Sequence, residues 1–152
     1  MRPIPRISPE EARVEAVEPR LLLLESVISE LERLGEADPE TYLESLSEMW
    51  KVERGLQLGA KILLDIGNHI LVAQFGVSPQ EYRDIFDRLA DRQVISRSMA
   101  DRLSGLAGFR NIIVHDYLEL NPTRVLENLG RAPKDFSEFA REIRDWLAGR
   151  PA

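Results

Sequence analysis

Eight consecutive residues concentrate the chemically versatile side chains of this sequence. In order they are Arg110, Asn111, Ile112, Ile113, Val114, His115, Asp116 and Tyr117. The run combines a permanent cation, an amide, an imidazole that titrates near neutral pH, a carboxylate and a phenol. On a helix, Arg110 and Tyr117 point almost the same way because they are seven residues apart. Asn111 and His115 share a neighbouring face, so the run predicts a polar cluster on one side of a helix.

These residue types suit the cleavage of phosphodiesters. Arg110 can bind a phosphate oxygen and stabilise charge that develops in the transition state. His115 can remove a proton from a ribose 2′-OH or donate one to the leaving oxygen, and this route needs no metal ion. A symmetric dimer would bring two copies of His115 together. By residue type alone, a surface polar network or a helix cap is the more frequent explanation of such a cluster.

Other kinds of chemistry find little support in the sequence. There is no cysteine, which excludes disulfides and thiolate ligands, and no Gly-rich phosphate loop, HExxH or EF-hand pattern is present. Asp65 and His69 are four residues apart and can share a helix face. Stable metal sites normally need three or four ligands, so we interpret this pair as a local hydrogen bond or a half-buried core histidine. We predict no metal and no cofactor.

The formal net charge of −6 argues against indiscriminate binding of nucleic acid. The charge is unevenly distributed, because residues 1–82 carry 8 basic and 15 acidic side chains, whereas residues 83–110 carry 6 and 4. The one basic stretch therefore leads directly into the run that begins at Arg110. A solvated helix face is the ordinary explanation of such a stretch.

The spacing of apolar residues predicts an all-α protein. We expect helices over about residues 19–34, 39–75, 79–91 and 96–118, a short turn or helix after Asn121-Pro122, and a last helix that opens at Pro133. The second would be unusually long, so a bend is expected near Gly55, Gly59 or Gly67. Ser78 is the expected N-cap of the third helix. The result is an up-and-down bundle of four to five main helices.

We expect residues 1–17, which contain three prolines, to form an N-terminal arm, and residues 18–150 to form a single helical domain. The charged start of the chain lacks the apolar stretch of a signal peptide. The longest leucine run, Leu21 to Leu24, is too short to span a membrane. These features predict a cytoplasmic protein without membrane contact, and the absence of cysteine fits a reducing compartment.

The pattern Arg110-x4-His115-x-Tyr117, with Asn111 after the arginine, resembles the R-x4-H-x-Y signature of the HEPN superfamily. It is most similar to the HepT-like branch, whose members are toxins encoded beside a minimal nucleotidyltransferase antitoxin. The resemblance covers roughly residues 20–147. It includes the blocks Glu53-Arg54-Gly55-Leu56-Gln57, Asp65 to Ile70, Tyr82-Arg83-Asp84-Ile85-Phe86 with Leu89, and Leu106-Ala107-Gly108-Phe109.

This resemblance implies a HEPN-like fold and a homodimer whose two motifs face one cleft. It implies a metal-independent RNA endonuclease with Arg110 and His115 as catalytic residues and Asn111 supporting phosphate binding. Tyr117 matches the tyrosine that the cognate nucleotidyltransferase modifies with AMP, which silences the toxin. The added phosphates would occupy the anion site beside Arg110. The implied substrate is cytoplasmic RNA, with tRNA among the candidates.

Two alternatives remain open at this point. The chain could be a non-enzymatic helical partner or nucleotide-sensing subunit of a nucleotidyltransferase, with the run as a docking surface. It could also be a structural helical protein in which the run is a polar network. The second alternative predicts that Arg110→Ala and His115→Ala each cost about 1–3 kcal/mol of stability, the usual cost of a broken buried hydrogen bond.

Overall fold

Segments with apolar residues at helical spacing form helices throughout the part of the chain that the computed structural model describes, residues 14–104 and 121–149. A single turn of 3-10 helix, η1 (Val14–Ala16), precedes the first α-helix. The α-helices are α1 (Val17–Gly35), α2 (Pro39–Leu43), α3 (Leu46–Phe75), α4 (Tyr82–Asp91), α5 (Arg97–Ser104) and α7 (Pro122–Gly149). No strand occurs within these residues, and the expectation of an all-α fold is confirmed.

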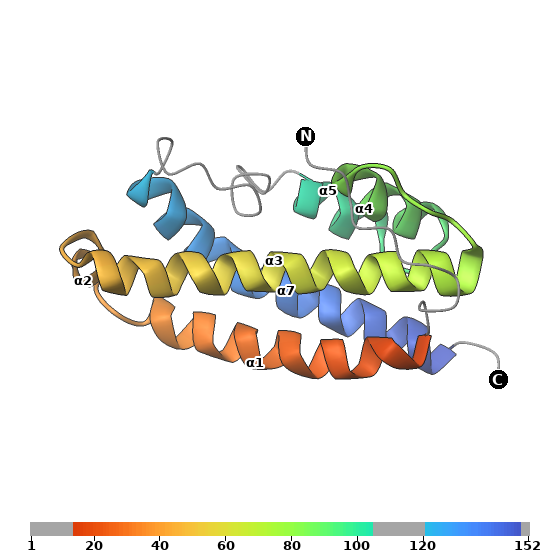
Figure 1. Ribbon diagram of the computed structural model, residues 1–152, viewed down its shortest axis with the longest axis horizontal. Coiled ribbons are helices and arrows are strands. Elements are labelled where there is room, and N and C mark those ends of the chain that lie inside the picture. Colours follow the sequence, from red (N-terminus) through yellow and green to blue (C-terminus); the bar gives the residue numbers. More distant parts are fainter. Residues whose placement is uncertain (1–13, 105–120, 150–152) are drawn as a thin grey trace.

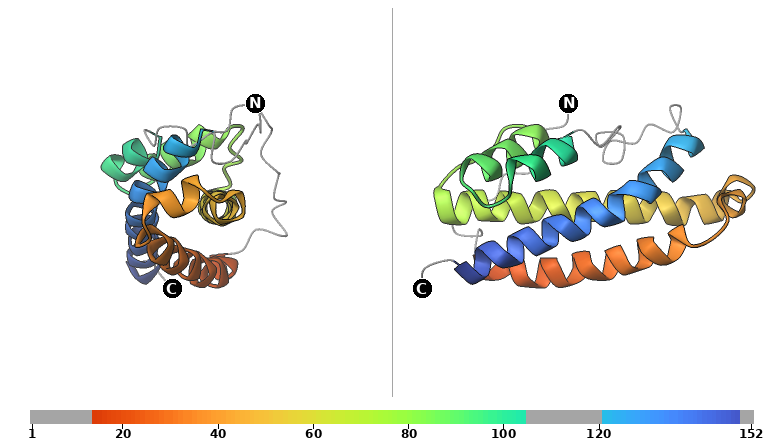
Figure 2. Two further views of the ribbon diagram at one scale, coloured as in Figure 1. Left: turned by 90° about the vertical axis from the view of Figure 1, so that its left-hand side faces the viewer. Right: turned by 180° about the vertical axis from the view of Figure 1, so that it is seen from behind.

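The long helices form an up-and-down bundle (Figure 1). Helices α1 and α3 run side by side in opposite directions, and α7 packs against both. Helices α4 and α5 pack against each other on the other side of α3 from α1, and α5 also contacts α7 (Figure 2). Arg144 of α7 pairs with Glu18 and Glu25 of α1, and these carboxylates raise the pKa of its guanidinium.

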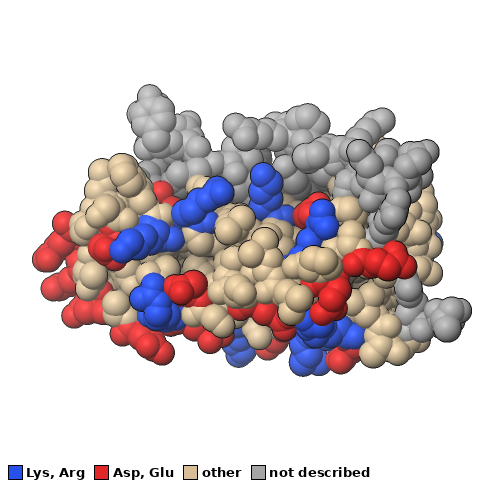
Figure 3. Space-filling model, turned by 60° about the horizontal axis from the view of Figure 1, so that its bottom comes forward, with Lys and Arg blue, Asp and Glu red and all other residues tan. Residues whose placement is uncertain are grey.

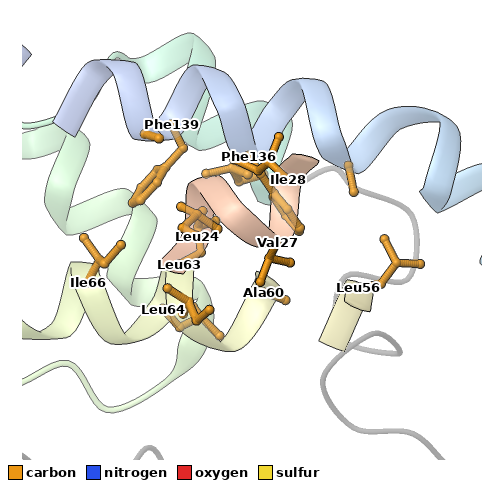
Figure 4. Close-up of a cluster of buried hydrophobic side chains, with 14 of the residues drawn as sticks. Leu24, Val27, Ile28, Leu56, Ala60, Leu63, Leu64, Ile66, Phe136 and Phe139 are labelled. Atoms are coloured by element: carbon orange, nitrogen blue, oxygen red, sulfur yellow. The ribbon is translucent and has the colours of Figure 1, made fainter. Parts of the chain in front are cut away.

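The core lies where α1, α3 and α7 meet (Figure 4). Each of these helices contributes large apolar side chains that are almost fully buried. Those in the close-up include Leu24, Val27 and Ile28 of α1, Leu56, Ala60, Leu63, Leu64 and Ile66 of α3, and Phe136 and Phe139 of α7. Phe86 of α4 meets Phe139 edge-on, with ring centroids 6.4 Å apart, so the core continues toward α4.

The predicted helix over residues 39–75 is two helices. Helix α2 begins after the N-cap Asp38 and ends at Leu43, and α3 begins after Ser45, whose hydroxyl accepts a hydrogen bond from the backbone N–H of Glu48. The bend expected at a glycine does not occur, since α3 runs straight and unbroken from Leu46 to Phe75 (Figure 1).

The glycines of α3 allow close packing instead. A Cβ at Gly59 would lie 2.6 Å from the ring of Phe136, and one at Gly67 would lie 2.5 Å from the side chain of Ile85. Gly59 therefore permits α7 to approach α3, and Gly67 does the same for α4.

Two predicted helix starts are wrong. Helix α4 begins at Tyr82 after Glu81, so Ser78 does not cap it and Pro79 precedes it. Pro133 does not open the last helix but lies inside α7, which begins at Pro122. The missing N–H of Pro133 breaks one backbone hydrogen bond, and the first turns of α7 are inclined to the rest of the helix (Figure 2).

Helix α3 is long and apolar enough, by length and composition, to cross a membrane. However, 72% of its most apolar window is buried inside the fold, as expected of a helix at the centre of a bundle. Its composition is therefore weak evidence for a membrane span.

Val17, the last residue of the predicted N-terminal arm, is fully buried and therefore belongs to the core.

Candidate active site

The four predicted site residues, Arg110, Asn111, His115 and Tyr117, lie outside the described residues, which stop at Ser104 and resume at Asn121. The structure describes the two helix ends that flank them, α5 before and α7 after. The contacts of these two helices show how the described chain on either side of the run is held in the fold.

Helix α5 is attached to α7 at its first residue. The hydroxyl of Ser96 accepts a hydrogen bond from the N–H of Met99 at 3.0 Å and so caps the helix. The backbone N–H and the hydroxyl of Ser96 both donate to the carboxylate of Glu142, on α7. One glutamate therefore fixes the start of α5 against the last helix, and the predicted start of this helix near Ser96 is confirmed.

A second set of contacts fixes the end of α5. Its last turn buries Leu103 completely and carries Arg102, which forms ion pairs with Glu138 and with Asp135, the latter at 3.6 Å. Asp135 is only 7% exposed, and burial raises the pKa of its carboxyl, while the charge of Arg102 opposes that rise. The cluster Arg102–Asp135–Glu138 therefore attaches the last described turn of α5 to the middle of α7.

The start of α7 is fixed by its own cap. The side-chain oxygen of Asn121 accepts a hydrogen bond from the N–H of Arg124 at 3.3 Å, and its carbonyl accepts one from the N–H of Val125. Pro122 occupies the first helical position, where its missing N–H costs nothing. The predicted restart at Asn121-Pro122 is confirmed, although it opens a long helix.

The other histidine of the chain lies in a different cluster. His69 is 5% exposed, and its Nε2 lies 3.6 Å from Oδ1 of Asp65. The second oxygen of Asp65 accepts a hydrogen bond from Nε of Arg20. Burial lowers the pKa of His69, and Nδ1 of its ring is buried without a hydrogen-bond partner in the described structure. This arrangement agrees with a core histidine next to an ion pair.

The structure brings together charged residues that spacing in the sequence could not pair. Arg20 lies 45 residues before Asp65, and Arg102 lies well before Asp135 and Glu138. From the sequence alone, only local signals could have pointed to these clusters, such as the three-residue spacing that puts Asp135 and Glu138 on one helix face. No group of three or more potential metal ligands occurs within the described residues.

An all-helical bundle with an R-x4-H-x-Y run in the sequence between α5 and α7 is a protein of the HEPN class. The model of one family, "Ribonuclease HepT-like", matches residues 24–143, which span most of the chain and include the whole run. The chain belongs to the ribonuclease HepT-like family.

Two curated relatives agree with this assignment. The chain is 38% identical over 89 residues to the mRNA nuclease HepT of Shewanella oneidensis, a match that covers 59% of this chain and 67% of the relative. It is 26% identical over 131 residues to the tRNA nuclease HepT of Aphanizomenon flos-aquae, which covers 86% of this chain and 89% of that protein.

Solved structures show the same fold. One is the tri-AMPylated HEPN toxin of Shewanella oneidensis in complex with its MNT antitoxin. It superposes with a TM-score of 0.74 at 29% identity, over 85% of this chain and 96% of the toxin. A toxin–antitoxin structure with AMP-PNP gives a TM-score of 0.73 at 28% identity, over 84% of this chain and 96% of that one. As a member of this family, the chain is a ribonuclease of the toxin type.

Proposed function

We propose that this protein is a metal-independent endoribonuclease toxin in which Arg110 and His115 perform the cleavage and a cognate nucleotidyltransferase silences it at Tyr117. The observation that carries the proposal is the complete motif, from Arg110 to Tyr117, inside the segment that matches the ribonuclease HepT-like family. The contacts between α5 and α7 support it, because they hold together the two described helices between which the motif lies in the sequence.

In this proposal, His115 removes the proton from a ribose 2′-OH, and the resulting oxygen attacks the adjacent phosphorus. The bond from phosphorus to the 5′-oxygen breaks, and that oxygen takes a proton from the protonated imidazole of the second His115 in the proposed dimer. The products are a 2′,3′-cyclic phosphate and a 5′-hydroxyl end. Arg110 stabilises the negative charge on the non-bridging oxygens, and Asn111 donates a hydrogen bond to the same phosphate.

The proposed partner is a minimal nucleotidyltransferase antitoxin that transfers AMP to the hydroxyl of Tyr117. The similar toxin of Shewanella oneidensis is tri-AMPylated and bound to such an antitoxin. AMP on Tyr117 would place phosphate charge on the helix face that it shares with Arg110, and so compete with RNA.

We further propose that the active form is a homodimer in the cytoplasm, with two copies of His115 in one cleft. The substrate would be cellular RNA, and the relatives named as mRNA and tRNA nucleases supply the two candidate classes. Light scattering should give the mass of a dimer, whereas a monomer that cleaves RNA at full rate would contradict this part of the proposal.

The cleavage chemistry is tested with purified protein and labelled RNA in excess EDTA. The wild type should yield fragments that end in a 2′,3′-cyclic phosphate, and Arg110→Ala and His115→Ala should each yield none. Both variants should melt within a few degrees of the wild type, since a structural role predicts a loss of stability instead. A folded His115→Ala variant that still cleaves would contradict the catalytic assignment.

The silencing step is tested by incubating the chain with its nucleotidyltransferase and ATP. Peptide mass spectrometry should place AMP on Tyr117, with loss of RNA cleavage in proportion to modification. Tyr117→Phe should remain unmodified, and Tyr42→Phe, a change in the core, should be modified like the wild type. Modification of Tyr117→Phe to the wild-type level would show that another residue is the target.

A further inference from the structure

One row of side chains on α3 remains unexplained by the fold. Trp50, Arg54, Gln57 and Lys61 follow one another at spacings of four, three and four residues. On a helix these spacings place all four on one face. We call this row the α3 stripe.

The α3 stripe combines an exposed aromatic ring with exposed cations. The indole of Trp50 is 57% exposed, unlike the large apolar residues of the core. Arg54 and Lys61 are exposed, and Gln57 between them is half-buried. The rise of an α-helix separates Arg54 and Lys61 by about 10 Å along the axis.

The two cations of the stripe have no carboxylate of their own. In the part of the chain that the structure describes, neither Arg54 nor Lys61 forms an ion pair. The nearby acidic groups on α3 are already engaged, because Glu48 pairs with Lys51 at 2.7 Å and Asp65 pairs with Arg20. Glu53, the neighbour of Arg54, is engaged as well, so the stripe holds two cations that form no ion pair within the described residues.

Exposed cations without an ion pair to another described residue also occur on α7, at Arg124, Arg131 and Lys134, so what distinguishes the stripe is that its cations share a helix face with the exposed ring of Trp50. Figure 3 shows Lys and Arg side chains in a row along the length of one face, while acidic side chains gather at the end where α2 lies. Local positive charge on an acidic protein favours one kind of ligand, a polyanion that contacts this face only.

We propose that the α3 stripe binds single-stranded RNA, with a base stacked on Trp50 and backbone phosphates on Arg54 and Lys61. Aromatic rings and cations in alternation are how proteins bind single strands without reading sequence. Gln57 adds a hydrogen-bond donor between the two cations. This proposal rests on the ribonuclease function above and extends it by naming a second contact with the substrate.

A second copy of the chain fits this face less well than RNA does. A two-fold contact centred on the stripe would bring the cations of both copies together, and like charges across an interface are costly.

The position of the stripe in the fold also suits RNA. Helix α3 passes below both flanking ends of the catalytic run, the end of α5 and the start of α7, in the view of Figure 1.

The test separates binding from cleavage by using a 2′-O-methyl oligonucleotide of a single base, which lacks the 2′-OH that the reaction needs. Fluorescence anisotropy measures its affinity for the full chain in EDTA over a series of salt concentrations. The variants are the double change Arg54→Ala/Lys61→Ala and the single changes Trp50→Ala and Trp50→Phe. The matched control is Arg33→Ala/Arg141→Ala, which removes two exposed cations from α1 and α7.

The double variant should lose at least about tenfold in affinity at low salt, and its slope of log affinity against log salt should fall by roughly 1.4, since each phosphate contact contributes about 0.7. Trp50→Ala should lose roughly 5- to 150-fold with an unchanged slope, and Trp50→Phe should retain most of the affinity. The control should bind like the wild type.

Several results would overturn the proposal. They are a wild type that does not bind the oligonucleotide, stripe variants that bind it normally, and a control that loses as much as the double variant. A change from dimer to monomer in Trp50→Ala would assign the stripe to an interface between copies. Loss of antitoxin binding with normal RNA binding would assign it to the partner.

The kinetic constants distinguish a failure of the RNA-binding proposal for the α3 stripe from a failure of the catalytic assignment. Stripe variants should raise KM for RNA and leave kcat within about threefold, because their contacts are the same in the ground and transition states. His115→Ala should abolish kcat and bind the 2′-O-methyl oligonucleotide normally.

Discussion

At the scale of the residue, we assign different roles to the two histidines of this chain. His115 belongs to the proposed catalytic pair, whereas His69 is buried in α3 beside Asp65. Desolvation is the main cause that lowers the pKa of His69, and Arg20 adds to it, while Asp65 opposes it. The folded protein therefore keeps this imidazole neutral at a pH where the unfolded chain would already protonate it.

This difference predicts a loss of stability in mild acid. In the unfolded chain His69 has a pKa of about 6.5, and in the folded protein its pKa is lower. The unfolded state therefore binds the proton first, and the free energy of unfolding falls as the pH drops below about 6.5, by at most about 1.4 kcal/mol per pH unit. Urea melts from pH 7.5 to 5 measure this decline.

The comparison variant for this prediction is His69→Gln, which cannot be protonated. It should lose less stability than the wild type over the same pH range. Other titrating groups, His115 included, are common to both proteins and cancel in the difference. If the free energies of unfolding of the two proteins fell in parallel with pH, the assignment of the acid-induced loss to His69 would be contradicted.

At the scale of the element, the all-α class and the apolar faces could be predicted from spacing, but the division into helices and several boundaries could not. The bend expected in the long helix is replaced by a break at Glu44-Ser45, because Ser45 caps a new helix there. Gly59 and Gly67 serve contacts with α7 and α4. Pro133 is tolerated inside α7 since its ring is buried in the core. The Ser45-x-x-Glu48 spacing is a local signal of a helix start, whereas the contacts of Gly59, Gly67 and Pro133 override local propensity and leave no such signal.

The glycine contacts of α3 predict a destabilising effect of alanine at Gly59. Alanine favours a helix by about 1 kcal/mol over glycine, but its Cβ would lie 2.6 Å from the fully buried ring of Phe136. Overpacking of this kind costs about 1–3 kcal/mol. Gly130→Ala is the matched control, because nothing lies within 4 Å of a Cβ there. Thermal melts should show a lower Tm for Gly59→Ala and an equal or higher one for Gly130→Ala.

The cluster at the end of α5 predicts a pH-dependent cost of losing Arg102. Arg102→Ala leaves Asp135 buried with a weaker counter-charge, so we expect a loss of about 1–3 kcal/mol near neutral pH. Burial already raises the pKa of Asp135, and removal of Arg102 raises it further. As the pH falls through that raised pKa, the folded variant takes up a proton and the loss should shrink.

Chemical denaturation at pH 8 and pH 5 measures this change. Arg141→Ala is the control, because its pair with Asp145 is largely exposed and should contribute less than about 1 kcal/mol. A loss of the same size at both pH values would indicate that Arg102 acts through packing alone. RNA cleavage by Arg102→Ala should also fall, since the turn that leads into the catalytic run loses its contact with α7.

At the scale of the whole molecule, an acidic protein must approach an acidic substrate. The motif and its family could be recognised from the sequence, but the α3 stripe could not, since its cations count as ordinary surface charge until their lack of partners is visible. The net charge of −6 repels RNA at distances beyond the reach of the stripe. The salt concentration decides whether the repulsion by the net charge or the attraction by the stripe dominates. The Debye length is about 30 Å at 0.01 M and about 10 Å at 0.1 M.

This balance predicts that RNA association is slowed at very low salt by acidic charges outside the α3 stripe. Glu36, Glu40 and Glu44 are exposed at the end of the molecule where α2 lies. Their combined replacement by lysine changes the net charge from −6 to 0. Stopped-flow association with a 2′-O-methyl oligonucleotide should be several-fold faster for this variant at 0.01 M salt, and the advantage should vanish near 0.5 M. The corresponding glutamine variant should lie between the two, and kcat for cleavable RNA should not change. An advantage that persists at 0.5 M would mean that the lysines contact RNA directly.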